Sequence, residues 1–219
     1  STMGEALSLA SMTVDGGYAD TVLAVASSHF GSAEKQFRFP LEYGNQRPMS
    51  STWTVTGCGA FVLSKEYGDV QISGITTGIV VDYGVKDSMN MGACMAPAAA
   101  NLIYQHFKDF ECLPEDYDAI ITGDLGEVGH DILCKLLYDQ GFDISGVHRD
   151  CGMEIFDNPN QDTHSGGSGC GCSAVTLAGK IMKEFEEGRL NRILFVPTGA
   201  LLSTVSYNEG HSVPGIAHG

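Results

Sequence analysis

The second half of the chain alternates short apolar runs with amphipathic stretches. Residues 118–122 (DAIIT) and 192–196 (RILFV) are apolar runs of the length expected for buried strands. Residues 128–137 and 174–185 carry apolar side chains at helical spacing, and a further helix is expected to open at Ala96 with a proline in its first turn. Strands that alternate with helices in this way predict a layered α/β fold.

The start of the chain continues this pattern. Residues 3–14 have the apolar spacing of a helix, and Thr2 with Glu5 forms a candidate capping box at its beginning. Residues 21–26 (TVLAVA) form a short apolar run that predicts a buried strand. The α/β pattern is therefore expected from the first residues onward.

Residues 29–53 form a polar, aromatic and turn-rich segment that we interpret as a long irregular loop. Loops of this size in compact domains are usually functional or form an interface, and the cations of this loop, Arg38 among them, fit an interface or an anion contact. Two stretches rich in β-forming residues follow, at 53–64 and 70–81.

Composition narrows the possible functions. The chain has 27 acidic and 12 basic residues, a formal net charge of −15, which argues against binding to the phosphate backbone of a nucleic acid. Its 7 cysteines include no CxxC pair, so we expect reduced thiols rather than a disulfide framework or a zinc site. No membrane-spanning apolar stretch, secretory signal or EF-hand loop is present in the sequence.

The strongest local motif is the glycine-rich run at residues 165–172 (SGGSGCGC), which leads into a predicted helix. Backbone amides at a helix N-terminus favour an anion, but the run lacks the Gly-Lys-Ser/Thr of a P-loop and the second glycine of a nucleophile elbow. The run either forms part of an anion-binding pocket or allows close packing of the backbone. We interpret Cys170 and Cys172 as thiols with a packing role.

Polar side chains also follow the predicted strands. Asp124 comes directly after the 118–122 strand, where it would either contact a ligand or cap the next helix. His29 follows the first strand and could act as a base, a proton donor or a carboxylate partner, or be a structural histidine. We interpret His130, on the following helix, as a surface or packing residue.

Several runs along the chain carry a family resemblance. They are 27–40 (SSHFGSAEKQFRFP), 91–99 (MGACMAPAA), 105–109 (QHFKD), 116–125 (DYDAIITGDL), 166–175 (GGSGCGCSAV), 191–192 (NR), 198–203 (TGALLS) and 216–219 (IAHG). In this order they resemble the stage V sporulation protein AD (SpoVAD) family, thiolase-like proteins of endospore formers. The match extends from one end of the chain to the other.

The resemblance implies a thiolase-like fold, in which two similar halves pack as α/β/α/β/α layers. Residues 1–90 would be the remainder of the N-terminal half, with the 29–53 loop, and residues 91–219 would be the C-terminal half. Ser1 would directly follow the position of the nucleophilic cysteine of thiolase-like enzymes. We therefore expect an upstream segment of about a third of the fold, and a last strand after Gly219. Homodimerisation is also expected from the resemblance.

The resemblance also indicates where catalytic residues would lie. Condensing enzymes of this superfamily use a histidine where this chain has Gly123, and another histidine or an asparagine where it has Ser168. Acyl transfer needs a base and an oxyanion donor beside the thiolate. The expected function is therefore binding rather than catalysis, with a thiolase-superfamily condensing enzyme, acting on thioesters, as the alternative.

The ligand that the family implies is dipicolinic acid (pyridine-2,6-dicarboxylate), free or as its calcium chelate. The implied role is its uptake into the developing spore with other SpoVA proteins, at the periphery of the inner membrane. A scaffold whose 29–53 loop docks membrane partners is a further alternative. We predict no catalytic residue, cofactor or protein-bound metal. The predicted ligand contacts are Ser1, Thr2, His29, Arg38, Asp124, Gly166, Gly167, Ser168 and Gly169.

Overall fold

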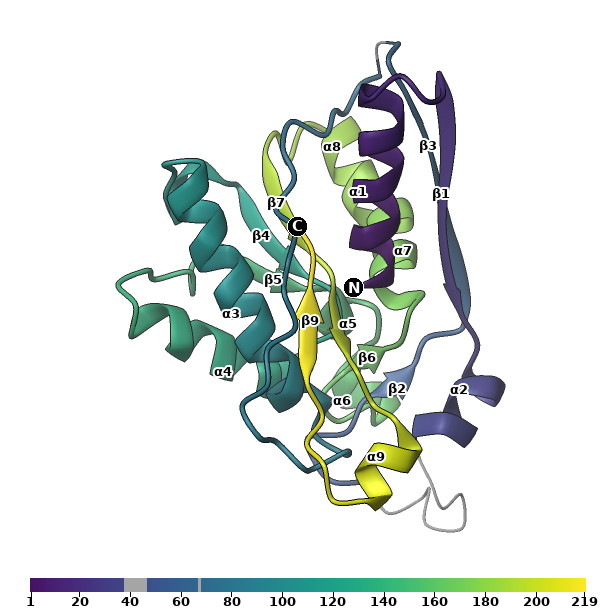
Figure 1. Ribbon diagram of the computed structural model, residues 1–219, viewed down its shortest axis with the longest axis vertical. Helices are drawn as coiled ribbons and strands as arrows, with labels where there is room; N and C mark the ends of the chain where they lie inside the picture. The colour runs from purple at the N-terminus through teal and green to yellow at the C-terminus, as the bar shows by residue number, and fades with distance from the viewer. Residues whose placement is uncertain (38–46, 67) are drawn as a thin grey trace.

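A three-stranded parallel sheet lies at the centre of the structure, a computed structural model that describes residues 1–37, 47–66 and 68–219 (Figure 1). Its strand order is β5 (His148–Asp150), β4 (Ala119–Thr122) and β7 (Ile193–Val196). Every residue of β4 is buried, as expected for the middle strand of a parallel sheet covered on both faces. The strands predicted from the two apolar runs are confirmed.

Helices α3 (Met91–Asp109) and α4 (Gly126–Tyr138) cover one face of this sheet (Figure 1). Ile120 of β4 packs there against Ile103 of α3 and Leu133 of α4, and all three side chains are 0% exposed. Alternate residues of a strand point to opposite faces, so Ile121 joins the core on the other face. The predicted helix at 128–137 is confirmed.

The start of α3 differs from the prediction. The helix begins at Met91 rather than at Ala96, because the side chain of Asn90 accepts a hydrogen bond from the amide of Ala93 at 3.1 Å and caps the helix earlier. Pro97 therefore lies inside the helix and not in its first turn. Gly92 allows close packing in this added turn, since a Cβ there would lie 2.5 Å from the carbonyl oxygen of Leu125 and 2.8 Å from the amide nitrogen of Gly129 in α4.

The other face of the sheet is covered by a helical segment that follows the glycine-rich run. It consists of α7 (Cys172–Thr176), a π-helical turn (Leu177–Ile181) and α8 (Met182–Glu186). Cys172 and Ile181 are both 0% exposed and pack against Ile121. The predicted helix at 174–185 is confirmed, with the π turn as an addition.

An antiparallel pair, β1 (Thr21–Ser28) and β3 (Gly57–Ser64), lies beyond these helices, and α1 (Thr2–Asp15) packs against it (Figure 1). Ala24 and Ala26 are buried under α1, whereas Leu23 is 61% and Val25 44% exposed. The prediction of a fully buried first strand is therefore wrong, because only one face of β1 is covered.

The segment from residue 29 to residue 53 is not irregular throughout. Its first part forms α2 (Phe30–Phe37), and residues 38–46, with Arg38, lie outside the described residues. The prediction for 70–81 is also wrong, since this stretch contains no strand and is joined to the C-terminal segment by an isolated bridge between Val81 and Gly215. The backbone of Thr76 also exchanges hydrogen bonds with Gly219.

The remaining elements are short and were not predicted individually. They are β2 (Trp53–Thr54), the 3-10 turn η2 (Pro114–Asp116), α5 (Cys151–Glu154), α6 (Asn158–Gln161), β6 (Gly167–Ser168), β8 (Thr198–Ala200), α9 (Thr204–Asn208) and β9 (Gly215–Ala217). Strand β2 pairs in parallel with β6, and β8 pairs antiparallel with β9. These two small pairs lie beside the carboxyl end of the central sheet (Figure 1). The division at residue 90 stays a prediction.

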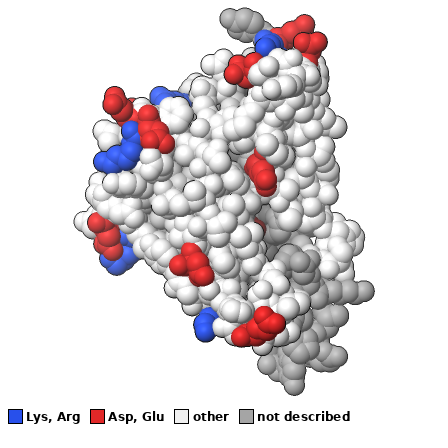
Figure 2. All heavy atoms as spheres, in the orientation of Figure 1, with Lys and Arg blue, Asp and Glu red and all other residues white. Residues whose placement is uncertain are grey.

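Charged side chains are sparse on the face of the molecule shown in Figure 2, and most of those visible lie near its edges. Among the described residues, no helix is both long enough and apolar enough to cross a membrane. The half-buried side chain of Arg149 in β5 donates to Glu154 at 2.6 and 2.8 Å and to the buried Glu184 at 2.7 and 3.2 Å. It thereby joins β5 to α5 and α8.

Replacing Arg149 by methionine is expected to lower the free energy of unfolding by about 2 kcal/mol at pH 7, because charge-assisted hydrogen bonds to a nearly buried carboxylate are lost. Hydrogen bonding by Arg149 lowers the pKa of Glu184. The stabilisation by Arg149 is therefore fully present above the ordinary pKa of a glutamate carboxyl group. It is lost as the pH falls through the lowered pKa of Glu184. Urea denaturation at a series of pH values measures both effects.

Lys135→Met is the matched control, because Lys135 pairs with Asp139 on the surface of α4, with side chains 72% and 57% exposed. An exposed pair of this kind contributes about 0.5 kcal/mol or less. Equal losses in the two variants, or a loss for Arg149→Met that does not change with pH, would contradict the interpretation.

Candidate functional site

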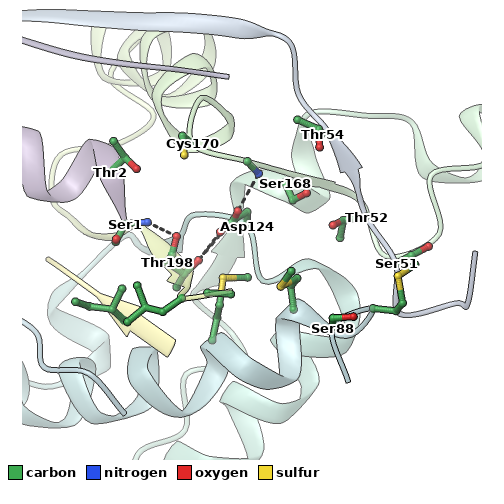
Figure 3. Close-up of a pocket in the computed structure, with 18 residues that line it drawn as sticks. Ser1, Thr2, Ser51, Thr52, Thr54, Ser88, Asp124, Ser168, Cys170 and Thr198 are labelled. Carbon is green, nitrogen blue, oxygen red and sulfur yellow. Dashed lines mark hydrogen bonds between the residues drawn. The ribbon is translucent and has the colours of Figure 1, made fainter. Parts of the chain in front are cut away.

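A cavity of about 220 Å³ opens where the start of α1, the end of β4, the glycine-rich run and β8 meet (Figure 3). Most of its polar lining consists of hydroxyl groups. The lining residues are Ser1, Thr2, Ser51, Thr52, Thr54, Ser88, Met89, Met91, Met95, Asp124, Ser168, Gly169, Cys170, Thr198, Gly199, Ala200, Leu201 and Ile216. The cavity lies at the carboxyl ends of parallel strands, where ligands bind in open α/β sheets.

Asp124 is the acidic residue of this lining and joins three segments of the chain (Figure 3). One carboxylate oxygen accepts from the Thr198 hydroxyl at 2.8 Å and the other from the Gly169 amide at 3.0 Å. The Asp124 amide in turn donates to the Thr198 oxygen at 3.1 Å, and the Ser1 nitrogen donates to the Thr198 carbonyl. Burial raises the pKa of Asp124.

The glycine-rich run divides into two parts. Gly166 and Gly167 pack against α5: a Cβ on Gly166 would lie 2.4 Å from the carbonyl oxygen of Gly152. Ser168, Gly169 and Cys170 line the cavity instead. Gly166 and Gly169 have φ values of 115° and 103°, which favour glycine, so the run turns toward the cavity between them. Close backbone packing is therefore confirmed for the first part of the run, whereas anion binding by the part that lines the cavity stays a prediction.

Of the predicted contacts, the structure brings five together in the cavity lining and places three others outside it. Those that line the cavity are Ser1, Thr2, Asp124, Ser168 and Gly169. Gly166 and Gly167 lie behind it, and Arg38 is outside the described residues. His29 is exposed at the end of β1, where its ring accepts from the Gly31 amide at 3.1 Å, and it is not part of the cavity lining.

Sequence reasoning missed two groups of lining residues. Thr198 and its neighbours follow β7, so the rule that placed Asp124 at a strand end would also have found them. Ser51, Thr52 and Thr54 come from β2 and the residues before it. They reach the cavity because β2 pairs with β6, more than a hundred residues away, and no local pattern indicates that pairing.

The geometry leaves no room for a catalytic side chain at position 123. A Cβ on Gly123 would lie 2.8 Å from the Thr198 amide nitrogen and 3.0 Å from the Cα of Pro197. The described lining contains no histidine, lysine or arginine. Hydroxyl and amide groups of this kind can hold the oxygen atoms of a small anion, and Asp124 can interact with a cation; the hydroxyls and amides do not take up protons near neutral pH.

Comparison with solved structures identifies the class of fold. The 3-oxoacyl-[acyl-carrier-protein] synthase III of Aquifex aeolicus VF5 superposes with a TM-score of 0.54 at 11% identity, over 99% of this chain and 63% of that one. AbyA1, a tetronic acid condensing enzyme, gives a TM-score of 0.53 at 14% identity over the same shares. The chain thus has the thiolase-like fold of condensing enzymes, and the predicted fold class is confirmed.

Sequence comparison then identifies the family. The family model of stage V sporulation protein AD (SpoVAD) matches residues 1–219. The stage V sporulation protein AD of Bacillus subtilis (strain 168) is 49% identical over 219 residues, which are 100% of this chain and 64% of the relative. The chain therefore belongs to the stage V sporulation protein AD family, as the resemblance predicted. It spans 64% of the length of that relative.

Replacing Asp124 by alanine is expected to lower the free energy of unfolding by about 1–3 kcal/mol for each buried donor left without an acceptor, the Gly169 amide and the Thr198 hydroxyl. Denaturation with urea measures the change. Asp20→Ala, at an exposed position just before β1, is the control and is expected to stay within 0.5 kcal/mol of the parent, as is usual on surfaces. Equal stability of the two variants would contradict the interpretation that Asp124 joins three segments of the chain.

Proposed function

We propose that this protein binds dipicolinic acid, free or as its calcium chelate, and does not catalyse a reaction. In this proposal it acts in the uptake of the compound into the developing spore, as a peripheral homodimer at the inner membrane beside other SpoVA proteins. The observation that carries the proposal is a cavity on a condensing-enzyme fold that is lined with hydroxyls and whose described lining contains no histidine, lysine or arginine. The family supports a role in sporulation.

The distribution of polar groups suits a flat dicarboxylate. Ser1, Thr2 and Thr198 lie on one side of the cavity, and Ser51 and Thr52 lie on the other (Figure 3). The hydroxyls of Thr198 and Ser51 already donate to Asp124 and to the Pro48 carbonyl. Those of Ser1 and Thr2 on one wall and of Thr52 on the other can each donate to one carboxylate of the same ligand. The side chains of Met89, Met91 and Met95 supply apolar, adaptable surface between them, which suits an aromatic ring.

The charge of Asp124 bears on the form of the ligand. An ionised Asp124 would repel a dianion, and the burial that raises its pKa favours the neutral acid. A bound Ca²⁺ would remove the repulsion in another way, because calcium prefers carboxylate and other oxygen ligands. Titrations with and without calcium distinguish the two forms.

Isothermal titration of the full-length protein with dipicolinate, with and without calcium, is expected to show saturable binding. Ser168→Leu would place an apolar side chain in the cavity and is expected to weaken binding about 10-fold or more, which corresponds to about 1.4 kcal/mol. Circular dichroism checks that the variant folds. Absence of heat at millimolar ligand in both titrations would overturn the proposal.

Ser64→Leu is the matched control for this substitution. Ser64 is exposed and pairs with Thr21 at one end of β3. Gly57 marks the other end of β3, which is the end that lies near the glycine-rich run. The affinity of the Ser64→Leu variant for dipicolinate is expected to equal that of the parent protein. A loss of affinity as large as that of Ser168→Leu would show that the effect does not come from the cavity.

The absence of catalysis is tested separately. The full-length protein is expected to give no acyl transfer above background from acyl-CoA or acyl carrier protein thioesters, because Gly123 leaves no space for the catalytic histidine of condensing enzymes. A 3-oxoacyl-[acyl-carrier-protein] synthase III assayed in parallel is the positive control. Turnover that depends on the protein would favour the condensing-enzyme alternative.

A further inference from the structure

Three potential metal ligands gather on the α4 side of the central sheet, apart from the cavity. His130 and Cys134 lie four residues apart on α4 and so share a helix face, and His148 is the first residue of β5. The ligand atoms that the three side chains offer all lie within 4.8 Å of one another. None of these three residues lines the cavity described above.

The hydrogen bonds of His148 determine which of its ring nitrogens is free. The Thr122 hydroxyl donates to the Asp150 carboxylate at 2.6 Å, so its oxygen accepts from Nε2–H of His148 at 2.9 Å. The Nδ1 atom of His148 then carries a lone pair. Histidines that bind metal characteristically donate their other ring N–H to a fixed partner in this way.

That lone pair points at His130. The two Nδ1 atoms are 2.5 Å apart, closer than an ordinary N–H···N hydrogen bond, and the Cys134 sulfur lies 3.9 Å from Nε2 of His130. Two nitrogens held this closely share either one proton or one cation.

The surroundings of the cluster favour a cation. The carboxylates of Asp131 and Asp143 act on Cys134 electrostatically. Their negative charge attracts a positive ion, and a bound cation stabilises a thiolate ligand. His130 and Cys134 are half-exposed, so an ion can reach them from solvent.

We propose that His130, Cys134 and His148 bind Zn²⁺, with a solvent molecule as the fourth ligand. Two imidazoles and one thiolate are ligands that zinc accepts in tetrahedral sites. The half-exposed ring of His130 turns to widen the 2.5 Å gap to the spacing of two zinc ligands. On binding, the S–H bond of Cys134 breaks, the sulfur binds zinc and one proton leaves to solvent. The ion joins α4 to β5.

The test uses full-length protein freed of metal, titrated with Zn²⁺ and, as a spectroscopic probe, with Co²⁺. The parent is expected to bind Zn²⁺ with release of one proton, measured as the dependence of the heat on buffer ionisation, and to give a thiolate-to-cobalt charge-transfer band. Cys134→Ser is expected to lose this band, and His130→Ala and Cys134→Ser to weaken zinc binding at least about 10-fold.

Matched controls are Cys58→Ser and His211→Ala, at exposed positions outside the cluster. They are expected to keep the parental zinc affinity. Equal zinc affinity in the parent and in the double variant His130→Ala/Cys134→Ser would overturn the proposal and leave a hydrogen-bonded histidine pair. Dipicolinate binding is expected to be unchanged in the double variant, so failure of this site and failure of the proposed function can be told apart.

Discussion

Two buried carboxylates organise the point where β4 ends and α4 begins. Asp150 accepts hydrogen bonds from the amides of Leu125, Gly126 and Met153 and from the Thr122 hydroxyl. Because β4 is covered on both faces, no water satisfies these donors, and a side chain must do so. Asp124 performs the same task for the Gly169 amide and Thr198. The ends of β4 and β7 and the glycine-rich run are held together in this way.

The same arrangement fixes the polar groups of the cavity wall. Both oxygens of Asp124 already accept hydrogen bonds from the protein, so the residue supports the cavity wall. The same close packing brings the Thr198 amide against Gly123, where a Cβ would lie 2.8 Å from the amide nitrogen. Apart from Asp124 and the Cys170 thiol, the polar side chains of the lining are hydroxyls, which donate and accept but do not take protons near neutral pH.

The central part of the fold could be predicted from sequence because its signals are local. Strand β4 and helix α4 follow from apolar periodicity, and Asp124 follows from its place at a strand end. The start of α3 depends on a cap by Asn90 that overrides the proline signal. The cavity wall at Thr54 depends on the pairing of β2 with β6, a long-range contact that leaves no periodic trace.

Thr122 joins the cavity wall to the proposed metal cluster through the two roles of its hydroxyl group. The hydroxyl proton goes to Asp150, so the carboxylate keeps its full set of donors and the β4–α4 turn below the cavity is satisfied. The hydroxyl oxygen must then accept from Nε2–H of His148, which leaves Nδ1 of that ring free to bind a cation. The hydrogen bonds that satisfy the turn at the end of β4 therefore also set the tautomer of the histidine beside it.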